Sequence, residues 1–245
     1  MKPIISALII SATSLGVAFL FSTPLKHYVA RNDTISVTGL GEQEFDADIA
    51  HWNVSFSRKA ATLQEGSTAL KSDEAAIRKY LISHGIHEEM ISAGAISFSK
   101  EFTNTTDTKG QTTSVFDGYT FSQTLTVSAE KPEGLDRIGT VSKSITELLW
   151  QGIELSSSTP EYLYTKLADL KINLIAKASV DAHSRAEQIA KNSGMSLDGL
   201  KSAMIGVLQI TAKDSSEAYS DIGTYNTDSR KKVAAITIKT QYEMR

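Results

Sequence analysis

The chain has 245 residues, with 25 Lys and Arg against 28 Asp and Glu, and its formal net charge is −3. Apolar residues make up 41% and charged residues 22%, a balance typical of a folded globular protein. A faintly acidic chain lacks the basic surface that nucleic acids bind, so we expect no nucleic-acid partner. The chain contains no cysteine, which excludes disulfides, Cys-ligated zinc, iron–sulfur clusters and thiol nucleophiles.

Residues 1–31 differ in composition from the rest. An uncharged and mostly apolar stretch runs from Pro3 to Leu25. At about 1.5 Å per residue, a helix of this length just crosses a hydrocarbon core of about 30 Å. We therefore expect an uncleaved N-terminal helix that anchors the protein in the inner membrane, with the remaining domain in the periplasm.

Two other interpretations of this segment remain open. A cleaved signal peptide needs small residues at the cut, and Gly16-Val17-Ala18 offers such a pair. Cutting there would leave Phe19-Leu20-Phe21 exposed on the mature terminus, in the periplasm or the outer envelope. The third interpretation, a buried core helix, is the only one that does not imply export.

Residues 32–245 predict one α+β domain. Ile35 to Val37 predicts a short strand that ends in a turn at Gly39-Leu40-Gly41. From Ile49 to Ser57 apolar and polar residues alternate, which is typical of a half-buried strand. Its buried face is expected to hold Ala50, Trp52, Val54 and Phe56. A helix should begin at Thr62 and end at Gly85 in a left-handed cap.

The middle of the chain predicts a hairpin and a second helix. Strands around Ile96–Phe102 and Tyr119–Val127 should pair, with a Thr-rich polar loop at 103–114 between them. Pro132 is a typical helix start, and the apolar stripe of that helix continues to Gly152. A short strand is expected at Ile153–Ser157.

The longest helix is expected from the capping box at Ser158-Thr159-Pro160-Glu161 to Gly194, a length of about 50 Å. A strand at Ala203–Thr211, a polar loop at Lys213–Arg230 and a last strand at Lys232–Tyr242 should follow. The predicted order is β-β-α-β-β-α-β-α-β-β. Hairpins mixed with three main helices indicate an antiparallel-dominated α+β fold, not a doubly wound parallel sheet.

Three stretches of the chain together resemble the SIMPL family, bacterial envelope proteins of unknown function. They are Ile35–Glu42 with Asp46, Asp48 and Trp52, the helix end Tyr80–Ile86, and the block Tyr162–Leu200 with Ala178, Asp181-Ala182, Arg185-Ala186, Ile189-Ala190 and Gly194. The resemblance covers nearly all of residues 33–245. It implies an α+β fold, a periplasmic, outer-envelope or membrane-anchored location and, for some members, ring-like homo-oligomers. Family labels mention defence against oxidative stress and immunogenicity, and they supply no reaction or catalytic residues.

No pattern predicts a catalytic, cofactor-binding or metal site. Gly39-Leu40-Gly41 begins like a dinucleotide fingerprint, but Glu42 to Glu44 replace the last glycine and no helix follows. His84 and His87, with Glu88-Glu89, have a chelating spacing, yet Gly85 separates the two imidazoles, which favours a solvated helix end. Asp46 and Asp48 could bind a cation, and solvated or salt-bridged turn residues are favoured instead.

Other notable residues have structural interpretations. His51 and His183 lie in unrelated pattern positions, and the chain has no Gly-x-Ser-x-Gly elbow. Trp52 and Trp150 are expected in the core, with interface anchoring as the alternative. The 103–114 and 213–230 loops would be solvated or would bind a partner, and Tyr219 and Tyr225 in the second loop suggest contact with one.

Three functions are compatible with these patterns. The first is a non-enzymatic envelope protein that works by self-assembly or partner binding, as a homo-oligomer. The family resemblance implies that this oligomer is a ring and that the protein has a role in stress defence. The second is a binding module for a small molecule or an envelope component, with the two loops as its rim. The third is an unrecognised hydrolase, because a triad is defined by geometry and not by spacing. We expect the first, without a cofactor.

Overall fold

The computed structural model describes residues 34–106 and 110–245. In chain order its elements are β1 (Thr34–Asp46), β2 (Ile49–Ala60), α2 (Leu63–Ser83), η1 (Glu88–Met90), β3 (Ile91–Ala93), β4 (Ser97–Thr106), β5 (Thr112–Ala129), α3 (Pro132–Ser144), η2 (Ile145–Gln151), β6 (Glu154–Ser157), β7 (Glu161–Leu163), α4 (Leu167–Asn192), β8 (Leu197–Ile205), β9 (Gln209–Ala212), β10 (Thr224–Tyr225) and β11 (Lys231–Met244). The anchor expected at Pro3–Leu25 lies outside the described residues. Within the described ranges, no helix is long and apolar enough to cross a membrane.

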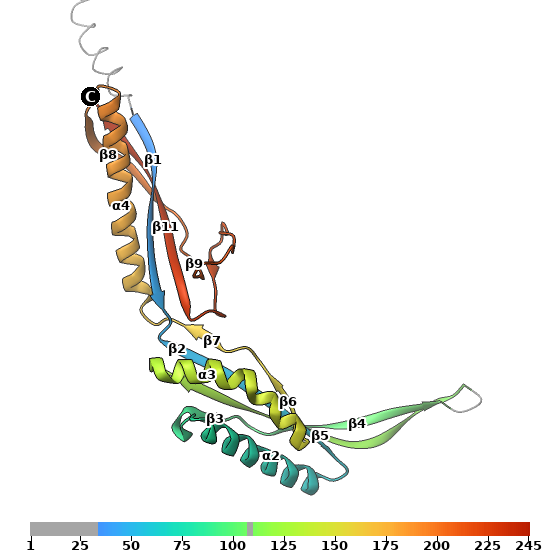
Figure 1. The fold of residues 1–245 in the computed structure, drawn as a ribbon. Coiled ribbons are helices and arrows are strands. Elements are labelled where there is room, and N and C mark those ends of the chain that lie inside the picture. The colour runs from blue at the N-terminus through green and yellow to red at the C-terminus, as the bar shows by residue number, and fades with distance from the viewer. Residues whose placement is uncertain (1–33, 107–109) are drawn as a thin grey trace, which may run out of the picture.

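The elements form two sheets that lie end to end, each with its own helices (Figure 1). The five-stranded sheet has the order β1-β11-β9-β10, with β8 also paired to β11, and α4 packs on one face. The six-stranded sheet has the order β3-β5-β2-β6, with β4 on β5 and β7 on β2. Helices α2 and α3 cover one of its faces. Strand pairs are antiparallel except β9–β10, so the predicted α+β fold is confirmed.

The core of the six-stranded sheet follows the predicted alternation along β2. Ala50, Trp52, Val54 and Phe56 are all buried beneath α2 and α3. The indole N–H of Trp52 donates to Ser157 Oγ at 2.9 Å and to the Ser158 carbonyl at 3.0 Å. Burial of this ring is therefore compatible with its polar nitrogen, since the N–H is satisfied.

The ends of α2 are as predicted. Thr62 Oγ1 accepts a hydrogen bond from the backbone N–H of Glu65 at 3.3 Å, as an N-cap does. Gly85 ends the helix at φ +86°, a left-handed conformation, and Ile86 N–H donates to the Leu81 carbonyl at 3.0 Å. Sequence signals at helix ends are therefore accurate where no strand competes for the same residues.

The predicted turn at Gly39-Leu40-Gly41 is wrong, because β1 continues through it for 13 residues. Gly39 and Gly41 pair with Ile238 and Ile236 of β11 and face α4. A Cβ at Gly39 would lie 2.2 Å from the Ala178 carbonyl oxygen, and one at Gly41 would lie 2.1 Å from that of Leu174. The glycines are thus required by the close approach of the helix to the strand.

The predicted start of the longest helix is also wrong. Helix α4 begins at Leu167, and Ser158 to Leu163 instead run along the edge of β2. The Ser158 hydroxyl donates to the Asn53 carbonyl at 3.2 Å, and β7 pairs with Ile49–His51. Strand pairing has overridden the local capping pattern, and at about 1.5 Å per residue the 26-residue helix is about 39 Å long.

Helix α4 buries one face along its length. Leu170, Leu174, Ala178 and Ala182 lie on this face. The stripe then continues with Ala186 and Ala190 and leaves Ile189 exposed. Small side chains are needed at these positions because the helix lies directly on β1.

The two halves meet at a polar junction. The Asp48 carboxylate accepts hydrogen bonds from Thr165, at 2.9 Å from the backbone nitrogen and 2.6 Å from Oγ1. Arg230 forms an ion pair with Asp136 of α3, and the Tyr162 N–H donates to the Thr227 carbonyl at 2.7 Å. These contacts link two hydrophobic cores that are separate clusters.

Candidate functional site

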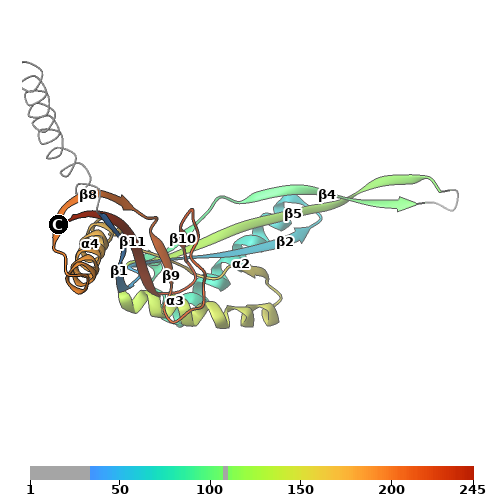
Figure 2. The same cartoon turned by 90° about the horizontal axis from the view of Figure 1, so that it is seen from above.

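A two-stranded arm projects from the six-stranded sheet (Figures 1 and 2). The polar loop predicted at 103–114 is mostly strand, since β4 reaches Thr106 and β5 begins at Thr112. Threonine favours strands, so a Thr-rich segment with continued alternation extends the hairpin. The paired residues run from Ser97 opposite Ser122 to Thr106 opposite Thr112, with an irregularity between Glu101 and Phe102.

One face of the arm carries a row of aromatic rings. Phe98 lies over Phe121 with centroids 5.7 Å apart, and Phe102 meets Phe116 edge-on at 5.9 Å. Tyr119 links the two pairs, with its ring 5.1 Å from Phe116. The row continues the buried face of β5 beyond the helices. Phe121 is 3% exposed, whereas Phe98 and Phe102 are each 57% exposed.

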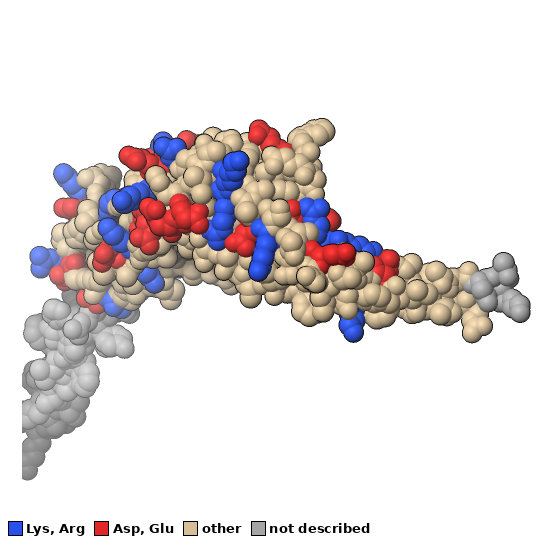
Figure 3. All heavy atoms as spheres, turned by 90° about the horizontal axis from the view of Figure 1, so that it is seen from below, with Lys and Arg blue, Asp and Glu red and all other residues tan. Residues whose placement is uncertain are grey.

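The opposite face of the arm is polar. Asp117 accepts hydrogen bonds from Lys59 Nζ and from Thr103 Oγ1, both at 2.7 Å. The Lys59 and Thr103 donors stabilise the carboxylate, so the pKa of Asp117 lies below its ordinary value. The described residues farther out, 102–106 and 110–116, carry no charge, and Figure 3 shows the projecting part largely free of charged atoms. The arm thus has one face rich in aromatic rings, which also carries Lys100, and its described outer residues are uncharged.

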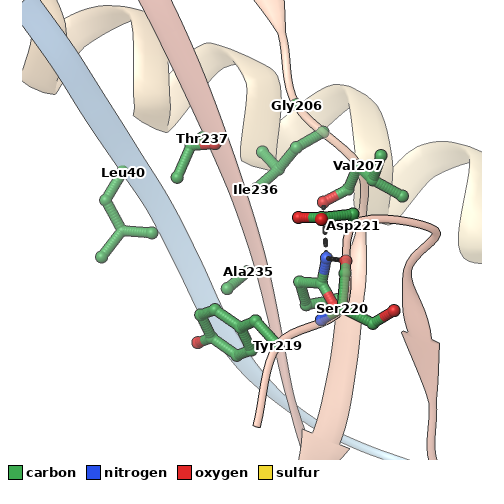
Figure 4. A pocket seen from close by; sticks show the side chains of 10 residues that line it. Leu40, Gly206, Val207, Tyr219, Ser220, Asp221, Ala235, Ile236 and Thr237 are labelled. Carbon is green, nitrogen blue, oxygen red and sulfur yellow. Dashed lines mark hydrogen bonds between the residues drawn. The ribbon is translucent and has the colours of Figure 1, made fainter.

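A second candidate is a pocket of about 360 Å³ on the face of the five-stranded sheet opposite α4 (Figure 4). Leu40 of β1 and Ala235, Ile236 and Thr237 of β11 contribute to its lining, and Tyr219 comes from the predicted 213–230 loop. The loop is held by Gln209, whose Nε2 donates to the Ser220 carbonyl at 2.7 Å. Gln209 Oε1 accepts from the Ser220 N–H at 3.2 Å. The lining is mainly apolar, with Asp221 as its charged side chain.

The two histidines with chelating spacing, His84 and His87, do not face a common metal position. The His84 ring stacks on Tyr80 with centroids 4.0 Å apart, and its Nδ1 lies 2.8 Å from the Tyr80 carbonyl oxygen. His87 and Glu89 instead border a hollow of about 530 Å³ next to Arg137. In residues 34–106 and 110–245, no group of three or more His, Asp or Glu side chains could hold a metal ion.

The other histidines and aspartates weighed in the sequence analysis are also apart from one another. His51 Nδ1 lies 2.9 Å from Ser128 Oγ on the uncovered face of the six-stranded sheet. The His183 ring meets Tyr242 edge-on at 5.6 Å on the other sheet. Asp46 ends β1 as the partner of Lys231, and the Asp48 carboxylate is engaged by Thr165. The structure therefore brings no nucleophile, base and acid of this set together.

The two tryptophans differ in burial. Trp52 is fully buried, whereas the predicted core position of Trp150 is wrong, because its side chain is 91% exposed in η2. Leu148 and Ile145 of the same element are buried. The change from α-helix to the tighter 3₁₀ form at Ile145 shifts which side chains face the sheet.

Comparison with protein-family models matches residues 35–242 to SIMPL, described as a protein of unknown function (DUF541). The chain belongs to the SIMPL family. A comparison with curated proteins gives no match.

The residues that carry the SIMPL resemblance have structural roles. The Asp181 carboxylate accepts from the Leu40 N–H on the edge of β1 at 2.8 Å and pairs with Arg185 at 2.8 Å. These two interactions, the backbone donor first, lower the pKa of Asp181. Ala178, Ala182 and Ala186 are buried, and Ala178 and Ala182 lie against Gly39. The family-like block of this SIMPL chain thus fixes α4 on β1.

The exposure of the aromatic face of the arm is not predicted, because an apolar alternation does not say which segment covers it. Phe98 and Phe102 predict a strand correctly, and the same pattern would suit a buried face. The available signal is the Thr-rich continuation on both sides of the hairpin. It contains no apolar partner segment for the aromatic face.

Proposed function

We propose that this SIMPL protein is an exported, non-enzymatic envelope protein that works by self-assembly, and that the arm is its contact surface. The observation that carries this proposal is the aromatic face of the arm, which continues a buried core face and which no element of residues 34–106 and 110–245 covers. Phe98, Phe102 and Phe116 expose roughly 300 Å² of ring surface between them, at about 200 Å² per ring. An apolar patch of this size matches the largest patch on many monomeric proteins, and such a patch often serves an interaction.

The place of the arm in the molecule suits a tethered protein. The first described residue, Thr34, lies at the far end of the five-stranded sheet from the arm (Figure 1). If Pro3–Leu25 anchors the chain, the arms of neighbouring copies would meet away from the bilayer. Tethering also raises the effective concentration of copies, so a modest contact area suffices for assembly.

Light scattering of the intact, detergent-extracted protein tests this function. We expect an oligomer for the natural chain and a monomer for the double variant Phe102→Ser with Phe116→Ser, because the apolar contact is then lost. Val180→Ser is the matched control, since Val180 is an exposed apolar residue on α4, away from the arm. A natural chain that stays monomeric at high concentration would refute self-assembly.

The pocket beside Tyr219 favours a second candidate function, the binding of a small molecule. Its volume of about 360 Å³ lies at the lower end of the range of ligand sites. An apolar lining with the Asp221 carboxylate suits a small aromatic compound with an amine, and phenethylamine is a suitable probe. A bound ligand should raise the melting temperature of the natural chain and leave that of Tyr219→Ala unchanged. Equal shifts in both proteins would exclude this pocket.

A further inference from the structure

We propose that a second copy of this chain adds its β4 antiparallel to the free edge of β4, with the two-fold axis at Phe102. This inference rests on the self-assembly proposed above and supplies its partner and register. Among the described strands, β4 pairs with β5 alone, so one edge of Ser97–Thr106 is unpaired. Such an edge presents a row of N–H and C=O groups that a second strand can bond.

Additional strands would stabilise the outer part of the arm. Strand β2 ends at Ala60 opposite Tyr119, so beyond this pair the arm is a ribbon of β4 and β5 only. A two-stranded ribbon is marginally stable in water, and three or more strands with an apolar face are needed for independent stability. Pairing of two β4 strands would turn each ribbon into half of a four-stranded sheet that carries the aromatic rings of both copies on one face.

The charges of β4 select the register. Residues directly opposite in an antiparallel pair point to the same face, so only an axis on a residue puts both aromatic faces on one side. An axis at Lys100 would put Lys100 opposite its own copy, and an axis at Glu101 would do the same with Glu101. Like charges directly opposite are destabilising. Axes nearer the tip shorten the paired length and separate the two Phe102 rings.

An axis at Phe102 removes these conflicts. Phe102 then faces Phe102 of the second copy, Lys100 faces Asn104, and Glu101 faces Thr103. The pairing runs from Phe98 opposite Thr106 to Thr106 opposite Phe98, entirely within β4. The β4 strands of two copies can therefore pair without placing like charges opposite each other. For this reason the free edge of β4 fits a second copy of this chain.

A charge exchange at position 102 tests the axis in the intact, detergent-extracted protein. Phe102→Lys and Phe102→Glu should each raise the protein concentration needed for half-assembly at least about tenfold, because each variant places like charges opposite. An equal mixture of the two should assemble within about threefold of the natural chain, since Lys then faces Glu. Val180→Lys and Val180→Glu are the matched controls on α4.

The outcomes of this exchange separate the two proposals. Assembly of both single variants as in the natural chain would refute the arm as contact surface, and with it both this inference and the proposed function. Loss of assembly in both variants without recovery in the mixture would keep the arm as the contact and refute the axis at Phe102.

Distances between spin labels test the register independently, because a cysteine-free chain accepts one engineered cysteine as a unique label site. With the axis at Phe102, the two copies of Thr103→Cys should be offset by ~7 Å along the strands and those of Ser97→Cys by ~34 Å. Equal offsets of ~20 Å at both positions would move the axis to Lys100 and refute the inference. Absence of a dipolar signal at Thr103 would refute the pairing itself.

Discussion

Lys232 shows how a single side chain can make the stability of this protein depend on pH. It is fully buried on β11, where its Nζ donates to the carbonyl and to the side-chain oxygen of Asn226. Burial lowers its pKa from 10.5 to about 8, against the weaker opposing attraction of Asp228 and Glu217. Removing the charge from water is unfavourable, and two neutral acceptors compensate only in part.

The lowered pKa of Lys232 predicts a rise in stability with pH. Between about pH 8 and 10.5 the unfolded chain binds a proton that the folded chain has released, so the free energy of unfolding increases across this window. Below pH 8 both states are protonated, and Lys232 contributes no slope. Urea unfolding at several pH values should show this rise in the natural chain and lose it in Lys232→Met.

The control for this prediction is the exposed neighbour Lys231, whose replacement by Met should preserve the rise. Comparing each variant with the natural chain isolates Lys232 from other groups that titrate near pH 10. An identical pH profile for Lys232→Met and the natural chain would show that Lys232 is not the source of the rise.

At the scale of the element, β1 and α4 show why glycine fits a strand. Gly39→Ala should destabilise the protein by about 2–3 kcal/mol, because the new methyl group would overlap the backbone of α4 and force helix and strand apart. Gly199→Ala in β8 is the matched control, since its added methyl group has no neighbour within 4 Å. The free energy of unfolding, from urea titration, checks both. Equal effects at the two positions would contradict close helix packing as the reason for Gly39.

How much the sequence predicts depends on whether a signal has one structural cause. The alternation along β2 and the cap at Thr62 have one cause each, and both predictions are confirmed. Glycine within an apolar alternation is compatible with a turn or with the close approach of another element, and Gly39 is a case of close approach. The capping pattern at Ser158 is local, whereas its pairing with Asn53 spans more than a hundred residues and is invisible in sequence. The candidate site is not predicted for the same reason. The exposure of Phe102 depends on whether a distant segment covers it, and the local sequence does not contain this information.

At the scale of the whole molecule, the six-stranded half is inserted in the chain between β1 and α4 of the five-stranded half. The chain leaves the five-stranded sheet after β1, builds the six-stranded half with residues 49–163, and returns at α4 to complete the first sheet. The two halves have separate hydrophobic cores, so cooperation between them depends on the junction. Asp48 and Arg230 provide polar contacts across it, and the first of these carries two hydrogen bonds from Thr165.

Removing these contacts should therefore separate the unfolding of the two halves. Fluorescence of the buried Trp52 reports the six-stranded half, because the emission of the exposed Trp150 changes little on unfolding. Circular dichroism reports the helices of both halves, α4 included. We expect coincident thermal midpoints from the two probes in the natural chain and divergent ones in the double variant Asp48→Ala with Arg230→Ala.

The arm supplies a control that removes a charge without touching the junction. Asp117→Ala breaks the exposed contacts with Lys59 and Thr103, and it should leave the two midpoints together because exposed ion pairs contribute little. Midpoints that stay coincident in the junction variant would mean that the chain connections and the remaining backbone hydrogen bonds, such as that from Tyr162 N–H to the Thr227 carbonyl, couple the halves.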